Sequence, residues 1–447
     1  MTLSESQSMA LRFLQTRKSP LLVCGAAGVG KSFLMSFYVN KLLSAGETVI
    51  VSCPTNKAKG VMASYLHKLD NDNLVVNTIS SLLSLTRQFD DNGIMRFVKK
   101  WKGKRPPSLK EFPDNTRIII DEASMIPEYE TNILLDIPHD IIFTGDKYQL
   151  YPVNELNSKV FASSIHSFEI TKTMRTNNEI LLTIFNCLRH QVARASRYEL
   201  KDTVSFAKTY NKIEGTNRDT FYICSGPKKF LRKVNAFIEN KENMMILCYT
   251  RKKAALYNNQ VREATFGENI DRFVNGERLV FDSYYDDGTH QRYTSDDIVV
   301  NRVHVENKYS SYFGRKFKVY ALLTRTEENK DVVYYKIHED NIKSYRAEVA
   351  SKRLELQRLG RKNKIASVSL WEEFNKGTAT LDAPLVYNYA MTVHKSQGST
   401  YENVFLDVDD CNNNGYTDHE TFTRLVYTGS TRSSVSLTML MCKNYFY

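Results

Sequence analysis

The chain has 447 residues, with 61 Lys and Arg against 50 Asp and Glu, a formal net charge of +11, and 26 Tyr and 23 Phe. This length is too great for one simple core, so two to four domains are expected. No stretch approaches the ~20 apolar residues of a membrane-spanning helix, and the N-terminus lacks the basic and apolar regions of a signal peptide.

The surplus of positive charge, interleaved with aromatic residues, suits single-stranded nucleic acid, because cations follow the phosphates and rings stack on bases. Many basic proteins bind no polyanion, so composition alone favours such a partner only modestly. The seven cysteines are scattered and form no C-x-x-C pair. They indicate reduced thiols in a cytoplasmic protein rather than a disulfide framework or a zinc site.

The first motif is a glycine-rich turn, G-A-A-G-V-G-K-S at residues 25–32, which follows a short apolar run. Lys31 offers a charge to the β- and γ-phosphates of a nucleotide, and Ser32 offers a hydroxyl to Mg²⁺. An ordinary strand–turn–helix corner is the alternative, but the strand before the turn and the apolar stretch after it favour a P-loop. Three glycines let the backbone N–H groups point inward at an anion: Gly25, Gly28 and Gly30.

Three further apolar runs, at 48–60, 116–126 and 139–150, alternate with helix-like segments, which indicates a parallel sheet. Polar residues follow the runs, where open α/β sheets bind ligands. We expect Asp121 to hold Mg²⁺ and Glu122 to orient or deprotonate the attacking water. Surface acids are the alternative, but three isoleucines directly before them make exposure unfavourable.

A second α/β core is expected from the runs at 243–263, 385–400, 403–408 and 423–440. Two stretches interrupt the alternation and are interpreted as insertions. The first, 83–115, contains Asp91-Asn92-Gly93, a strong hairpin signal. The second, 282–385, begins with strand-like runs and continues into a polar amphipathic helix at 344–360.

Taken in chain order, these motifs resemble superfamily 1 helicases over most of the chain, from Leu3 to Arg432. Within that superfamily the sequence is most similar to the branch that moves 5′ to 3′, and there to the small bacteriophage Dda-type helicases. The resemblance implies that Gln7 reads adenine and Gln149 senses the γ-phosphate. It also implies that Arg175 and Arg432 act as arginine fingers, which neutralise transition-state charge across a cleft.

The same resemblance implies a DNA path along both cores. Gly398, in the motif at 391–400, is expected to contact nucleotide from the second core. Ser80 stands where the family commonly has a histidine, so base stacking is not expected there. The residues expected to contact nucleic acid are Pro54, Thr55, Asn56, Lys57, Thr78, Thr250, Asn258, Thr392, His394 and Lys395.

The expected fold is therefore α/β, with two RecA-like P-loop domains, an inserted β-hairpin pin and an inserted small β-barrel with a helical extension. Phe89 and Phe97 flank the hairpin tip and are candidates for splitting the duplex, although they could instead anchor the hairpin to the first core. The expected boundaries are 1–82 and 116–178 for the first RecA-like domain, 83–115 for the pin, 179–281 and 386–447 for the second RecA-like domain, and 282–385 for the barrel.

Two functions fit this architecture. One is an ATP- and Mg²⁺-dependent DNA helicase that moves on single-stranded DNA. The other is a nucleic-acid-stimulated translocase that displaces proteins without efficient unwinding. A small-molecule kinase fits the P-loop alone and leaves the motifs of the second core unused. The expected partners are single-stranded and forked DNA and single-strand-binding or replication proteins, with no membrane. We expect a monomer in the cytoplasm, which is the host cytoplasm if a phage encodes the protein; the choice between DNA and RNA stays open.

Overall fold

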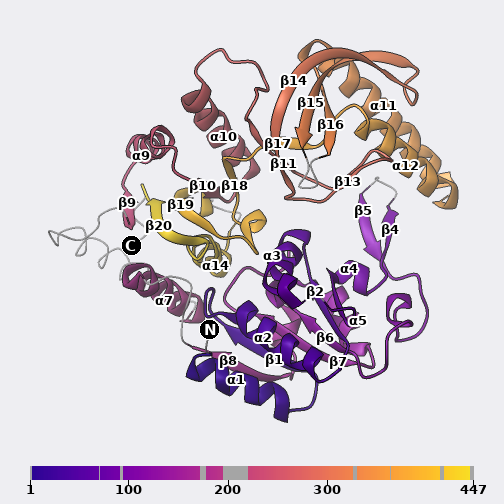
Figure 1. The fold of residues 1–447 in the computed structure, drawn as a ribbon. Helices are drawn as coiled ribbons and strands as arrows, with labels where there is room; N and C mark the ends of the chain where they lie inside the picture. The colour runs from indigo at the N-terminus through magenta and orange to yellow at the C-terminus, as the bar shows by residue number, and fades with distance from the viewer. Residues whose placement is uncertain are drawn as a thin grey trace. The chain divides into compact units, whose positions relative to one another are not determined.

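The protein is represented by a computed structural model that describes residues 3–69, 71–90, 94–171, 178–194, 220–325, 330–362, 364–412 and 417–442. The chain divides into two compact units (Figure 1). Unit 1 comprises Met1–Ser84, Trp101–Thr265 and Tyr389–Tyr447, and unit 2 comprises Leu85–Lys100 and Phe266–Asn388. No helix of the described ranges has the length and apolar character needed to cross a membrane. All seven cysteines are free thiols.

The first half of unit 1 is a six-stranded parallel sheet with the order β3-β2-β6-β7-β1-β8. Its strands are short apolar runs because both faces are covered, and Ile118, Ile119 and Ile120 are 0% exposed. Helices α1, α2 and α3 pack on one face. The elements are β1 (Leu21–Gly25), β2 (Val49–Cys53), β3 (Leu74–Thr78), β6 (Arg117–Ile120), β7 (Asp140–Gly145), β8 (His166–Ile170), α1 (Glu5–Thr16), α2 (Lys31–Ser44), α3 (Asn56–Leu66), α4 (Ile79–Leu82), α5 (Glu128–Asp136) and α6 (Lys159–Ala162).

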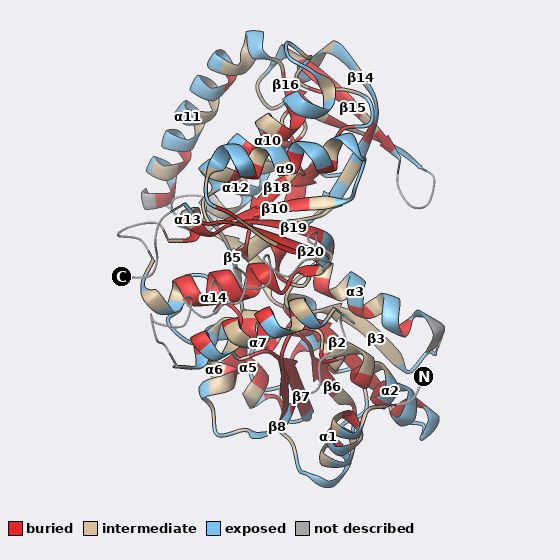
Figure 2. Ribbon diagram, turned by 90° about the vertical axis from the view of Figure 1, so that its left-hand side faces the viewer, coloured by how far each residue is buried: buried red, intermediate tan, exposed pale blue. Residues whose placement is uncertain are grey.

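The second half of unit 1 is a five-stranded parallel sheet with the order β18-β10-β19-β20-β9. Helices α7 and α14 pack on one face and α9 and α10 on the other. Figure 2 shows buried strands in this sheet, exposed outer faces on α9 and α10, and a largely buried α14. The elements are α7 (Glu179–Arg194), β9 (Phe221–Cys224), α9 (Pro227–Glu239), β10 (Met244–Cys248), α10 (Arg251–Phe266), β18 (Ala390–Thr392), β19 (Tyr401–Asp407), α13 (Val408–Cys411), α14 (His419–Ser430) and β20 (Ser433–Leu440).

Unit 2 is built on an antiparallel sheet with the order β16-β15-β14-β11-β17, and two long helices, α11 and α12, lie beside each other (Figure 1). A separate antiparallel pair, β4 and β5, forms the arms of a hairpin. The elements are β4 (Thr86–Phe89), β5 (Met95–Val98), β11 (Arg278–Phe281), β12 (Tyr285–Asp286), β13 (Gln291–Arg292), β14 (Asp297–Ser310), β15 (Arg315–Arg325), β16 (Asp331–Ile337), α11 (Glu339–Lys362), α12 (Lys364–Ala379) and β17 (Leu385–Tyr387).

The predicted fold class is confirmed: the two parallel sheets are those of two RecA-like domains. The edges of the insertions differ from the expected boundaries. Residues 101–115 lie with the first domain, where the Trp101 indole N–H donates to the Leu83 carbonyl at 2.7 Å. Strand β11 lies in unit 2 because it pairs with β14 and β17.

Candidate nucleotide and nucleic-acid sites

The candidate phosphate cradle lies between β1 and α2, at the carboxyl edge of the first sheet. Gly28 and Gly30 have φ angles of +84° and +78°, which only glycine adopts readily. A Cβ on Gly30 would lie 2.5 Å from the side-chain nitrogen of Gln7, and one on Gly25 would lie 2.6 Å from Val29. The turn therefore needs these glycines for both conformation and space, as a phosphate-binding loop does.

Two side chains hold this turn. The Lys31 ammonium donates to the carbonyls of Gly25 at 2.9 Å and Ala26 at 3.1 Å. The Gln7 side-chain nitrogen lies 3.3 Å from the Val29 carbonyl and 3.4 Å from that of Gly30. The Gln7 side-chain oxygen accepts the Ser4 N–H in a capping box that begins α1. The nitrogen end of the Gln7 amide thus supports the P-loop, and its oxygen end caps α1.

The two predicted carboxylates follow β6. Asp121 accepts hydrogen bonds from the Ser32 hydroxyl at 3.2 Å and from the Thr144 hydroxyl. Glu122 has a φ of +53°, a left-handed conformation that is costly for a residue with a side chain. Such strain concentrates at functional sites, so the turn that follows β6 is a candidate catalytic turn.

Ser32 and Asp121 have the chemistry to hold Mg²⁺. A hydroxyl and a carboxylate are hard oxygen donors, and Mg²⁺ in nucleotide sites keeps few protein ligands beside phosphates and waters. Within the described ranges, no group of three or more His, Cys, Asp or Glu side chains could hold a metal ion. The Ser32–Asp121 pair fits an ion shared with a nucleotide.

Gln149 and Asp146 lie in the loop after β7. The Asp146 carboxylate accepts the N–H of Ala27, in the P-loop, at 3.1 Å and the N–H of Tyr148 at 3.1 Å. Gln149 is 2% exposed, and its side-chain oxygen accepts no hydrogen bond from any residue that the structure describes. A buried acceptor without a donor is costly, so this oxygen is available to a ligand or water beside the P-loop.

Of the two predicted arginine fingers, the structure describes Arg432, whose guanidinium bonds groups of its own domain. Arg432 is 1% exposed, and its guanidinium donates to the carbonyls of Thr428 at 3.1 Å and Ser399 at 3.3 Å, both in its own domain. Arg175 lies outside the described residues. A finger role for Arg432 therefore requires it to exchange these carbonyls for a phosphate.

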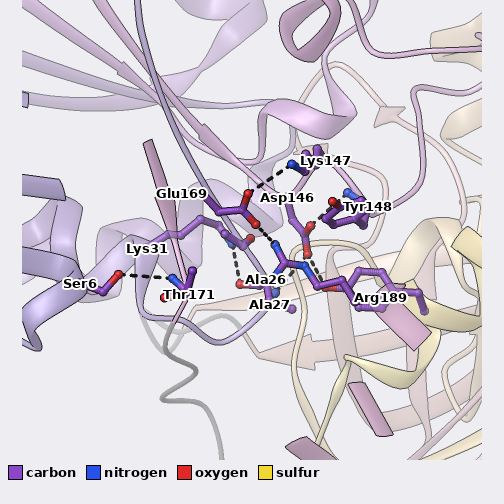
Figure 3. A network of polar contacts seen from close by, with 12 residues as sticks. Ser6, Ala26, Ala27, Lys31, Asp146, Lys147, Tyr148, Glu169, Thr171 and Arg189 are labelled. Atoms are coloured by element: carbon purple, nitrogen blue, oxygen red, sulfur yellow. Dashed lines mark hydrogen bonds and ion pairs between the residues drawn. The ribbon is translucent and has the colours of Figure 1, made fainter. Parts of the chain in front are cut away.

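A polar network joins the two RecA-like domains beside the P-loop (Figure 3). Arg189 of α7 pairs with Glu169 of β8 at 2.5 Å, and Lys147 approaches the same carboxylate at 3.2 Å. The Arg189 guanidinium and the Lys147 ammonium lie 4.9 and 5.0 Å from the centre of the Tyr148 ring. The loop after β7 is thus held by charges from both domains.

The four threonines predicted to contact nucleic acid share one structural role: each hydroxyl accepts an N–H from the first turn of a helix that it precedes. Thr55 begins α3 and Thr78 begins α4 in the first domain. Thr250 begins α10, and Thr392 lies before the short 3₁₀ turn at 394–396 in the second. The positive ends of the helix dipoles make the starts of α3 and α10 suited to phosphate, and at α10 the Asp410 carboxylate already accepts the N–H groups of Tyr249 and Thr250.

The remaining predicted contacts fall into two groups. The Lys57 ammonium lies 3.5 Å from the Tyr401 hydroxyl of the second domain. Gly398 lies close to Ala58 of the first domain, because a Cβ built on Gly398 would lie 3.4 Å from the Ala58 Cβ. Asn258 instead binds the backbone of Tyr389 and Ala390 and is 5% exposed, so its amide supports β18. The other residues of these motifs stand at or next to the same helix starts: Pro54, Asn56, His394 and Lys395.

His394 is unsuited to carry charge. Burial lowers the pKa of its imidazole below the ordinary value, and its ring lies 6.0 Å from that of Tyr249. A neutral ring can hydrogen-bond or pack, whereas the cation of this motif is Lys395.

Comparison with known proteins supports the predicted resemblance to helicases. Residues 2–209 match the AAA domain family, and residues 387–440 match the UvrD-like helicase C-terminal domain. An uncharacterized protein, R530, of Acanthamoeba polyphaga mimivirus is 24% identical, covering 92% of this chain and 93% of its own. The ATP-dependent DNA helicase dda of Enterobacteria phage T4 is 22% identical and covers 95% of both chains. The chain is similar to superfamily 1 helicases.

A solved structure of Pif1 helicase, from work on unwinding of forked DNA, aligns with all of this chain and 93% of its own, with 15% identity and a TM-score of 0.52. At that identity the likeness concerns the fold alone. The predicted resemblance to superfamily 1 helicases, including the Dda type, is confirmed, and the helicase relatives and family matches support the predicted class of enzyme.

The two arms of the predicted pin hairpin, β4 and β5, lie in unit 2. Phe89 pairs with Met95 across the two arms and packs against a cluster of Leu356, Trp371 and Phe374 on α11 and α12. Phe97 pairs with Arg87, whose guanidinium lies 4.4 Å from the Tyr284 ring. Phe89 therefore anchors the hairpin to the second insertion, an arrangement that the sequence did not suggest. The turn at 91–93 lies outside the described residues.

Sequence reasoning missed residues that join the two domains, chiefly Arg189, Arg424 and Tyr427. Tyr427 lies five residues before the predicted finger Arg432, but the local sequence gives no sign of its partner, Asp146. Arg424 lies one helical turn earlier, on the same side of α14. Their partners are about 280 positions away in the chain, as the separations of 277 and 281 residues show.

Proposed function

We propose that this helicase binds ATP with Mg²⁺ between its two RecA-like domains and moves along single-stranded DNA from 5′ to 3′, separating duplex ahead of it. The observation that carries the proposal is that helix α14 of the second domain bonds directly to the loop that faces the P-loop in the first, through Arg424 and Tyr427. Such a connection lets hydrolysis in one domain move the other.

In this proposal Lys31 binds the β- and γ-phosphates and Ser32 with Asp121 holds Mg²⁺, which offsets the charge that develops on the phosphoryl group. Glu122 orients or deprotonates water, and Gln149 uses its unpaired oxygen to position that water. Arg175 and Arg432 supply positive charge in the transition state. The capped starts of α3 and α10 bind phosphates of one DNA strand, and Lys57 and Lys395 add charge along the same path.

Two relatives support DNA as the polymer and unwinding as the outcome. The phage relative is an ATP-dependent DNA helicase, and the Pif1 structure comes from work on unwinding at forked DNA. Single-strand-binding and replication proteins are proposed partners, with the protein acting as a cytoplasmic monomer. Polarity is proposed from the family resemblance.

One pair of assays tests the function. ATPase activity measured with and without single-stranded DNA is expected to rise strongly with DNA, and single-stranded RNA of the same sequence measures the preference for the sugar. Unwinding of duplexes with a 5′ tail should exceed that of duplexes with a 3′ tail. ATPase without any response to nucleic acid would point to the kinase reading. DNA-stimulated ATPase without unwinding would favour the protein-displacing translocase.

Shortening the hairpin tests whether the protein acts as a helicase or as a translocase that does not unwind. Replacing residues 88–96 by a tight turn should leave DNA-stimulated ATPase and translocation largely intact, because these residues lie outside both RecA-like domains. Unwinding of a forked duplex should collapse, since each base-pair step holds about 1.4 kcal/mol of stacking that the pin must oppose.

Phe97→Leu is the milder companion variant, because it keeps the apolar arm and removes only a ring. Unwinding at the parent rate after shortening would show that the separating element lies elsewhere, and residues 282–385 would be the next place to search.

A further inference from the structure

One buried hydroxyl connects the second domain to the P-loop. Tyr427 of α14 is 0% exposed, and its hydroxyl donates to an Asp146 carboxylate oxygen at 2.7 Å. The same oxygen accepts the N–H of Ala27 at 3.1 Å. Burial and the negative charge of Asp146 raise the pKa of Tyr427 well above its ordinary value, so the hydroxyl keeps its proton. A P-loop N–H and a side chain of the opposite domain thus share one acceptor.

The same helix holds the rest of the loop. Arg424, 7% exposed, donates to the carbonyls of Lys147 at 2.7 Å and Gln149 at 2.9 Å, and Thr428 accepts the N–H of Leu150 at 3.1 Å. Hydrogen bonds from a buried guanidinium to carbonyls are strong. The backbone that carries Gln149 is therefore attached to α14, whereas the Gln149 side-chain oxygen accepts no hydrogen bond within the described residues.

Helix α14 also leads to the predicted finger. It ends at Ser430, and Arg432 donates back to its last turn through the Thr428 carbonyl. A helix transmits a rotation along its length because its backbone hydrogen bonds keep it rigid. Movement of the P-loop that displaces Asp146 must therefore displace the Tyr427 end of α14, and with it Arg432.

We propose that Tyr427 is a positioning residue for ATP hydrolysis: its hydrogen bond to Asp146 couples the P-loop to the orientation of α14 and so aligns Arg432 with the nucleotide. The inference rests on the proposed ATPase function. It assigns Tyr427 no contact with ATP. Its effect is expected on the rate of the bound state rather than on nucleotide binding.

Tyr427→Phe tests this by deleting the hydroxyl and keeping the buried ring. A lost bond to a charged group is expected to lower the maximal DNA-stimulated ATPase rate by about ten- to a hundred-fold, with KM for ATP changed by less than about three-fold. The ratio of rates with and without single-stranded DNA should fall in parallel, because the coupling, rather than the P-loop, is damaged.

Tyr257→Phe is the matched control. Tyr257 is 3% exposed and donates to Asp407 at 2.6 Å, but both residues lie in the second domain. Both variants lose a buried tyrosine–aspartate bond, so a comparable fall in melting temperature is expected. Only Tyr427→Phe should lose DNA-stimulated ATPase. Equal activity losses in the two variants would reduce Tyr427 to a stabilising residue and overturn the inference.

The outcomes separate the inference from the function. A wild-type protein without DNA-stimulated ATPase would refute the proposed function. An active wild type with a folded, fully active Tyr427→Phe would refute the coupling alone. If Tyr427→Phe does not fold, Asp146→Asn carries the test, because an amide offers one acceptor oxygen where the carboxylate offers two. A normal maximal rate in that variant would equally overturn the proposal.

Discussion

The two RecA-like domains use the same sheet edge differently. In the first domain, Asp121 accepts hydrogen bonds from the side-chain hydroxyls of Ser32 and Thr144. In the second, Asp410 accepts the main-chain N–H groups of Tyr249 at 2.8 Å and Thr250 at 2.7 Å. Hydroxyls can rotate toward a metal ion, whereas main-chain donors are fixed. The Asp121 carboxylate is thus held by donors that a metal ion can replace, whereas the Asp410 carboxylate is held by the backbone of its own domain.

The largest expected effect comes from removing the cation of the first domain. Lys31→Ala should lower ATP hydrolysis by about a thousand-fold or more, because a positioned charge beside the phosphates is lost. Binding of single-stranded DNA, measured by fluorescence anisotropy, should survive. Lys41→Ala, at an exposed position on the same helix, is the control and should behave as the parent. Near-normal hydrolysis in Lys31→Ala would exclude the P-loop assignment.

The second domain is tested by Arg432→Ala. Hydrolysis should fall by about a hundred- to a thousand-fold while nucleotide affinity changes little, because a finger acts chiefly in the transition state. Steady-state kinetics give the rate, and binding of a fluorescent ATP analogue gives the affinity. Arg432 also bonds three groups of its own domain, so thermal melts must accompany the kinetics. Weakened affinity with an unchanged maximal rate would contradict the finger role.

A smaller effect on DNA binding is expected at a feature that both domains share, a threonine that caps the start of a helix. Thr55→Ala and Thr250→Ala each remove a helix cap, which costs about 0.5–2 kcal/mol of stability. Each should also weaken DNA binding several-fold. Thr250→Ala should lower stability more than Thr55→Ala does, because the Thr250 hydroxyl also donates to Asp410 at 3.0 Å. Thr55→Ser and Thr250→Ser keep the hydroxyl and serve as controls; if the alanine variants bind DNA as the parent does, the helix starts are not phosphate sites.

The smallest effect concerns a carboxyl away from the nucleotide. Burial and the neighbouring Glu155 raise the pKa of Glu130, on α5, from its ordinary 4.5 to about 7. The folded state therefore holds this proton more tightly than the unfolded chain does, and the associated stability, full below about pH 4.5, is lost as the pH rises through 7.

Glu130→Gln should thus raise the melting temperature at pH 8.5 and change it little at pH 5, with a gain on the order of 1–2 kcal/mol in unfolding free energy. Glu239→Gln, at an exposed position in the second domain, is the control. A gain that does not depend on pH would assign the effect to packing instead of charge.

Much of this site could be predicted from the sequence because each motif is local. A pattern of only a few neighbouring residues is enough to predict the glycines of the P-loop, Asp121 after three isoleucines, and Thr55 after a β-branched run. The bonds of Asp146 and Tyr427 could not, since they join segments 281 residues apart and depend on how two domains pack. Asn258 misled for the same reason: its amide is used by the backbone of a strand more than a hundred residues later, at Tyr389 and Ala390.

The make-up of unit 2 from two distant segments has a consequence for biosynthesis. The hairpin of Leu85–Lys100 belongs to one unit with Phe266–Asn388, where Phe89 packs against Trp371 and Phe374. At translation rates of about 5–20 residues per second, the ribosome needs on the order of ten seconds or more to supply them. During that interval Phe89 lacks the aromatic partners that it has in the folded protein, so unit 2 completes its packing only late in synthesis.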